Sequence, residues 1–181
     1  MTMGSAVLVV FLLTVTPAAF AANSEADGFF AALQAQCGAR YVGASTFPPD
    51  PAHDFAGKTL VAEINSCQPD EIRIPFAVGE DRSRTWILRR EAGGLSWKHD
   101  HRHADGSPDA VTMYGGMATG AGTVLQQAFA ADAYTAALLP AAATNVWTVT
   151  LSADGSTLTY HLARHGQPRY EAVLYRQPVQ H

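Results

Sequence analysis

Residues 84–103 read RTWILRREAGGLSWKHDHRH and contain two alternating apolar segments on either side of a glycine pair. Alternation of apolar and polar side chains with a period of two is typical of a β-strand with one buried face. The stretch Ala92-Gly93-Gly94 suits a tight turn between antiparallel neighbours, with Gly93 in a two-residue turn. The stretch therefore predicts a hairpin. Its expected cross-strand pairs are Arg84 with His101, Trp86 with His99, and Leu88 with Trp97.

Similar short segments recur along most of the chain. Each is rich in β-branched or aromatic residues and is bounded by turn-forming pairs such as Asp105-Gly106, Asp154-Gly155 and His165-Gly166. Tight turns between sequence neighbours predict an up-and-down antiparallel meander. The expected strands are 40–46, 58–66, 71–78, 84–90, 95–103, 110–114, 145–152, 157–164 and 169–176.

Two segments depart from this pattern. Ser24 and Asp27 resemble the start of a helix, and apolar residues follow at helical spacing until Gly38, which predicts one short N-terminal helix. Residues 115–143 are rich in glycine and alanine. We expect a loop there, with a short strand near Phe129 and a helical turn at 132–139.

An open sheet of so many strands would leave two unpaired edges and a large apolar face. Closure into a barrel removes both, and the short connections do not fit the long crossovers of a Greek-key sandwich. We therefore predict a mainly β fold, an antiparallel meander closed into a barrel of about 8–10 strands. It forms a single domain over residues 23–181.

The N-terminus predicts export. Residues 6–15 form an apolar run that is too short to span a bilayer, and Pro17 and the tripeptide Ala19-Phe20-Ala21 follow it. This pattern is typical of a signal peptide over residues 1–22. The expected location is secreted or periplasmic, with no membrane span after cleavage.

Cysteine usage and charge agree with that location. The two cysteines, Cys37 and Cys67, are expected to form a disulfide in an oxidising compartment, and two free thiols are the alternative. The formal net charge is -4. This mild acidic balance provides no electrostatic attraction to nucleic acid.

The most informative cluster of polar residues is His99, His101 and His103. Side chains alternate across a strand, so these histidines share a face with Trp97, while the charged face that includes Asp100 is expected to be wet. If Asp105-Gly106 forms the next tight turn, Thr112 lies opposite His99 and Tyr114 opposite Trp97. The predicted ligand-binding residues are Arg84, Trp86, Trp97, His99, His101, Thr112 and Tyr114.

Two other interpretations of the histidines stay open. One is a transition-metal site for Zn or Cu formed by His99, His101 and His103. Because His99 and His103 are about 13 Å apart along an extended strand, that site needs a bulge or an outside ligand. The other is purely structural, with His99 packed in the wall and the other two solvated. No Gly-x-Ser-x-Gly or His-Glu-x-x-His motif is present, and we assign no catalytic residue.

The signal sequence, leading helix, meander and final strand with Tyr175 and Arg176 together resemble the calycin, or lipocalin-like, barrels. The resemblance is architectural. It implies a cavity for a small, largely apolar ligand or, in some bacterial relatives, a surface that inhibits proteases. The expected function is thus extracytoplasmic binding of a small molecule. Metal binding is the first alternative, and a secreted protein-binding inhibitor or structural module is the second.

Overall fold

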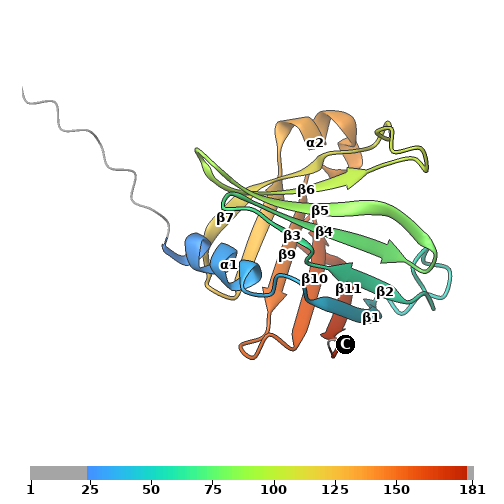
Figure 1. Cartoon of the computed structure of the whole chain (residues 1–181). Coiled ribbons are helices and arrows are strands. Elements are labelled where there is room, and N and C mark those ends of the chain that lie inside the picture. Colours follow the sequence, from blue (N-terminus) through green and yellow to red (C-terminus); the bar gives the residue numbers. More distant parts are fainter. Residues whose placement is uncertain (1–23, 179–181) are drawn as a thin grey trace, which may run out of the picture.

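A computed structural model describes residues 24–178 of the chain (Figure 1). The expected signal peptide, 1–22, lies outside these residues. The fold is mainly β, as predicted. Two α-helices and a short 3-10 helix accompany the strands. They are α1 (Ser24–Gln34), α2 (Ala133–Leu138) and η1 (Pro140–Ala142).

The strands form one closed antiparallel barrel. Nearly every strand pairs with its neighbours in sequence, and β2 pairs with both β1 and β4, which closes a ring of ten strands. The two-residue β3 pairs with β4 alone and is an extra strand. The strands are β1 (Arg40–Phe47), β2 (Leu60–Glu63), β3 (Ser66–Cys67), β4 (Glu71–Val78), β5 (Asp81–Glu91), β6 (Gly94–His101), β7 (Tyr114–Thr123), β8 (Gln126–Ala131), β9 (Asn145–Leu151), β10 (Thr157–Arg164) and β11 (Gln167–Arg176).

The register of the β5–β6 hairpin is as predicted. Trp86 lies opposite His99, and the pairs Arg84–His101 and Leu88–Trp97 follow on either side. Trp86, Leu88 and Trp97 are buried in the barrel core. This hairpin therefore projects its aromatic residues and His99 inward.

The prediction of an irregular loop over residues 115–143 is wrong, but the short strand expected near Phe129 and the helical turn expected at 132–139 are present, as β8 and α2. β7, β8 and α2 occupy most of that segment. Its glycines permit close packing of strands, because a Cβ atom on Gly115 would lie 2.0 Å from the carbonyl oxygen of Trp97. A Cβ atom on Gly116 would lie 1.7 Å from the carbonyl oxygen of Ala130. The small residues thus belong to the sheet.

The prediction of a strand at 110–114 is also wrong, because β7 begins only at Tyr114. A loop over residues 102–113 connects β6 to β7, in place of the tight turn predicted at Asp105-Gly106. The register between β6 and β7 therefore differs from the predicted one by two residues. Tyr114 lies opposite His99, where Thr112 was expected, and Gly116 lies opposite Trp97.

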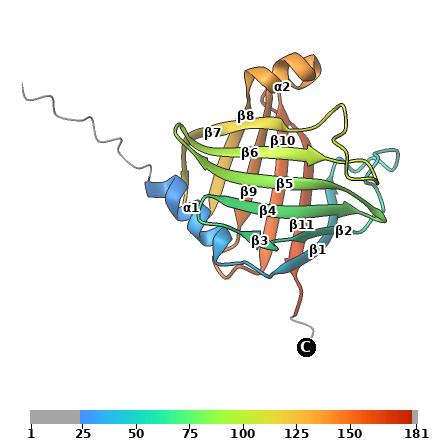
Figure 2. The same cartoon turned by 45° about the horizontal axis from the view of Figure 1, so that its top comes forward.

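Helix α1 covers one end of the barrel (Figures 1 and 2). Phe29, Phe30 and Leu33 are fully buried and belong to the same core cluster as the inner faces of the strands. The predicted disulfide between Cys37 and Cys67 is present and fastens the chain just after α1 to β3. This end is therefore closed by packing and by a covalent bond.

The other end of the barrel is formed by connecting segments. They include the loop 48–59, the loop 102–113 and the stretch 132–144 that contains α2. Figure 2 shows α1 and the loop 48–59 at opposite ends of the barrel. Within residues 24–178, no helix has the length and apolarity needed to cross a bilayer.

Candidate functional site

A cavity of about 300 Å³ opens at the end of the barrel opposite α1. Its walls come from strands on both sides of the barrel, and the loop 48–59 and the stretch after α2 form part of its rim. The lining residues are His53, Asp54, Phe55, Phe76, Arg84, Trp86, His99, His101, Tyr114, Leu139, Ala142, Asn145, Trp147, Tyr160, Leu162, Arg164, Arg169 and Tyr170.

Aromatic rings form most of the inner wall. Trp86 is stacked between Phe76 and Tyr160, with ring centroids 4.2 Å and 4.7 Å away, so β5 and β10 meet across the interior. Tyr114 stacks on His99 at 4.6 Å. These contacts hold the rings in fixed orientations and leave a wall that suits a flat apolar group.

Three arginines line the cavity near its opening. Arg84 pairs with Asp81, with its Nη1 2.5 Å from a carboxylate oxygen. The Nε atom of Arg164 donates a hydrogen bond of 2.8 Å to the side-chain oxygen of Asn145. Neither Arg164 nor Arg169 forms an ion pair with any residue that the structure describes. Two guanidinium groups are thus left to meet an anion.

His99 lies deeper, with a relative exposure of 4%. Its Nδ1 atom is 3.2 Å from the carbonyl oxygen of Tyr114, and its Nε2 atom is 2.8 Å from the hydroxyl of Tyr160. A carbonyl only accepts, so Nδ1 carries the hydrogen and Tyr160 donates to Nε2. Burial lowers the pKa of His99 from 6.5 to about 3, and the ring is neutral.

His101 is half-buried and lies nearer the opening. Its Nε2 atom is 3.2 Å from the hydroxyl of Tyr114. Burial, followed by the charge of Arg84, lowers the pKa of His101. Burial also raises the pKa of Tyr114 to about 12, and this phenol is neutral. The cavity therefore combines neutral hydrogen-bonding groups with cationic arginines.

The structure places five of the seven predicted ligand-binding residues on the cavity, namely Arg84, Trp86, His99, His101 and Tyr114. Trp97 faces inward but is fully buried beneath the cavity, in contact with Trp86 and His99. Thr112 does not line the cavity. Its hydroxyl accepts a hydrogen bond from the backbone N–H of His101 and donates to Asp100.

The prediction that the outer face of β6 is fully exposed to solvent is wrong. Asp100 has a relative exposure of 4%, because Thr112 and Arg102 bond to its carboxylate. Ser96 is buried as well, and its hydroxyl donates to Glu91. Hydrogen bonds with neighbouring side chains therefore satisfy both buried polar groups on this face.

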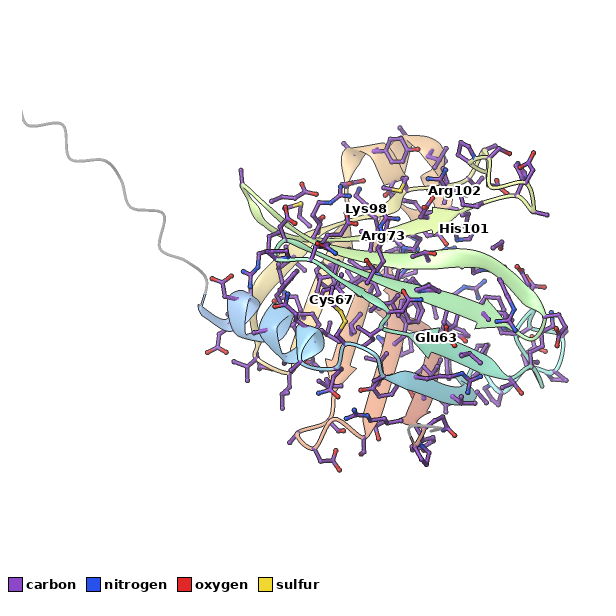
Figure 3. All side chains as sticks on the ribbon, in the orientation of Figure 1. Glu63, Cys67, Arg73, Lys98, His101 and Arg102 are labelled. Atoms are coloured by element: carbon purple, nitrogen blue, oxygen red, sulfur yellow. A yellow bond between two sulfur atoms is a disulfide. The ribbon has the colours of Figure 1, made fainter. Side chains whose placement is uncertain are left out.

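The three histidines expected to bind metal are not brought together. His99 and His101 lie on the cavity, but β6 ends at His101, and His103 is exposed in the loop beyond it. Figure 3 shows His101 away from Cys67, which lies beside α1. Among residues 24–178, no three His, Cys, Asp or Glu side chains are placed to hold one metal ion.

The half of the cavity that comes from β9, β10 and β11 was not predicted from the sequence. The main residues are Asn145, Trp147, Tyr160, Arg164, Arg169 and Tyr170. A usable signal was present in 157–164, where Leu158, Tyr160, Leu162 and Arg164 share one face by alternation. That face is the one directed into the barrel.

Comparison of the chain with models of known protein families, with curated proteins and with solved structures finds no match. The interpretation of the cavity therefore depends on its own geometry and chemistry.

Proposed function

We propose that this protein binds a small molecule with a flat apolar body and an anionic group, outside the cytoplasm. The observation that carries the proposal is the pairing of an aromatic cavity with two arginines at its opening that form no ion pair within residues 24–178. Arg164 and Arg169 provide the cationic groups, and Trp86, Trp147 and Tyr160 provide the aromatic surface.

The positions of these groups suit such a ligand. Arginine forms strong charge-assisted hydrogen bonds to carboxylate, phosphate or sulfonate oxygens, often through two N–H groups at once. Aromatic side chains in a preformed cleft bind apolar rings with little loss of their own conformational freedom. A ligand would thus insert its ring into the barrel and leave its charged end near solvent.

The extracytoplasmic location has two supports. The disulfide between Cys37 and Cys67 is a bond that persists in oxidising compartments. The apolar run at residues 6–15 is typical of a secretory signal. Export would place the cavity where it meets ligands from the surroundings of the cell.

The metal-binding alternative is not favoured by the geometry. Both ring nitrogens of His99 already have hydrogen-bond partners, and a metal ion would have to displace Tyr160 from Nε2. The third expected ligand, His103, does not line the cavity.

Two matched fluorescent probes test the proposal. We expect saturable binding of anionic 1-anilinonaphthalene-8-sulfonate and weaker binding of neutral N-phenyl-1-naphthylamine. The double variant Arg164→Ala, Arg169→Ala should weaken binding of the anionic probe by about tenfold or more, since two charge-assisted contacts are lost. Binding of the neutral probe should change by less than about threefold.

The control variant is Arg40→Ala, at the start of β1 near the closed end. Its affinity for both probes should equal that of the parent protein. Absence of saturable binding of either probe, or an equal loss for both probes in the double variant, would contradict the proposed function.

A further inference from the structure

We infer that the ligand carries a hydroxyl group on its ring, at the end opposite its anionic group, so that the class is the hydroxyaryl carboxylates and their anionic equivalents. This inference rests on the proposed function and names the chemistry of the inner end of the same cavity. The positions of the hydrogens on His99 and Tyr160 determine this chemistry.

The hydrogen-bond roles of this pair are fixed. Nδ1 of His99 must donate, because its partner is the backbone carbonyl of Tyr114. Nε2 of the neutral ring is therefore an acceptor, and it takes the hydroxyl hydrogen of Tyr160. The oxygen of Tyr160 keeps its lone pairs but has no hydrogen left to offer. Toward the cavity, this phenol acts only as an acceptor.

Tyr160 lies at the inner end of the cavity. Its relative exposure is 8%, whereas Arg164, four residues later on the same face of β10, lies near the opening. Four residues of strand correspond to about 13 Å. The cavity thus presents an acceptor inside and cationic donors near its opening, with aromatic surface between them.

The second polar pair of the cavity, His101 and Tyr114, does not select between ligand donors and ligand acceptors. If Nε2 of His101 accepts from the hydroxyl of Tyr114, then Nδ1 of His101 carries a free hydrogen. If Nε2 donates instead, the hydroxyl hydrogen of Tyr114 is free. One donor remains in either arrangement, so selection at the inner end depends on Tyr160.

A neutral hydroxyl on the ligand ring is the donor that best matches this acceptor. An ether or ketone oxygen would face the lone pairs of Tyr160, and an unsubstituted ring would leave those lone pairs without a donor. An ammonium group would be a desolvated charge at the inner end of the cavity, where the neighbouring His99 is neutral and offers no counter-charge. A phenol keeps its hydrogen at pH 7, since its ordinary pKa is about 10.

Three ligands that differ at one position test the inference. They are 4-hydroxycinnamate, cinnamate and 4-methoxycinnamate, each used to displace the anionic naphthalene probe from the purified protein at pH 7. We expect the hydroxy compound to bind about tenfold more tightly than cinnamate, and the methoxy compound to bind more weakly than cinnamate.

Two variants separate this recognition from general packing. In Tyr160→Phe, the ratio of the cinnamate and hydroxycinnamate dissociation constants should fall to less than about threefold. In His99→Leu, the hydroxyl hydrogen of Tyr160 loses its acceptor and becomes available to the ligand. The methoxy compound should then bind more tightly than in the parent protein, relative to cinnamate. Tyr175→Phe, at an exposed position of β11, should leave all ratios unchanged.

The outcomes distinguish this inference from the proposed function. Equal binding of the three compounds, or a preference for the methoxy compound in the parent protein, overturns the hydroxyl inference while cinnamate binding still supports an anion-binding cavity. A preference for hydroxycinnamate that survives in Tyr160→Phe also overturns it. Failure of all three compounds and both naphthalene probes to bind overturns the inference and the proposed function together.

Discussion

The hydroxyl of Tyr160 donates a hydrogen bond of 2.8 Å to Nε2 of His99 in the interior of the barrel. Since Nδ1 of the same ring donates to the carbonyl of Tyr114, Nε2 can accept the hydroxyl hydrogen of Tyr160 only while the imidazole is neutral. A second proton on the ring would remove the acceptor of Tyr160 and place a charge in an apolar core. Lowering the pH should therefore destabilise the fold through protonation of His99.

The first prediction concerns stability against pH. The pKa of His99 is about 3 in the fold against 6.5 ordinarily, so the unfolded chain binds the proton first as the pH falls. The free energy of unfolding should be fully maintained above pH 6.5 and should fall below it by about 1.4 kcal/mol per pH unit. His101, whose pKa is also lowered, contributes in the same direction.

Urea unfolding followed between pH 7.5 and pH 5 measures this slope. His99→Gln should reduce the slope, and the exposed His103→Gln should leave it unchanged. A parent protein equally stable at both ends of this range would contradict the assigned state of His99.

The second prediction concerns the stacked ring of Trp86. Truncation by Trp86→Ala removes a buried indole between Phe76 and Tyr160 and should lower the free energy of unfolding by about 3 to 5 kcal/mol. Chemical denaturation measures the loss. The exposed Tyr175→Ala is the matched control and should change stability by less than about 0.5 kcal/mol. Equal effects of the two substitutions would show that Trp86 does not contribute to the core in this way.

The third prediction concerns the close approach of β7 and β8. Gly116→Ala should destabilise the fold by about 1 to 3 kcal/mol, because the added methyl group meets the carbonyl oxygen of Ala130. Gly93→Ala is the control, since its Cβ atom would lie 3.5 Å from the nearest atom, a methyl of Met117. Thermal unfolding of the two variants should separate them clearly, and a parent-like Gly116→Ala protein would exclude this packing.

The fourth prediction concerns the disulfide. Replacing both Cys37 and Cys67 with serine should lower the free energy of unfolding by roughly 3 to 4 kcal/mol, because the bond constrains the unfolded chain between them. A reducing agent should produce a similar loss in the parent protein and none in the double variant. A loss of the same size in the double variant would assign the effect of the reductant to another cause.

The part of the fold that the sequence predicted well is the β5–β6 hairpin. Its alternation fixes which side chains face inward, and the two-residue turn at Ala92-Gly93 sets which residues lie opposite each other, so the register follows. The next strand was misplaced because residues 102–113 form a long loop, whose length no local pattern indicates. β7 was missed, and β8 was predicted only as a short strand near Phe129, because glycine and alanine carry little apolar alternation.

The candidate site was predicted on one side only. Local alternation places Trp86, His99 and His101 on the inner face of β5 and β6. The same alternation also places Tyr160 and Arg164 on one face of β10. It does not indicate which distant strands face each other once the barrel closes, and the contact between Trp86 and Tyr160 depends on that closure.

The disulfide that fastens the chain after α1 to β3 lies at the end of the barrel away from the cavity. The covalent cross-link is therefore spatially separate from the cavity of the proposed binding site. A protein engineer could exchange the segments 48–59 and 132–144 to obtain new selectivities while keeping that anchor intact.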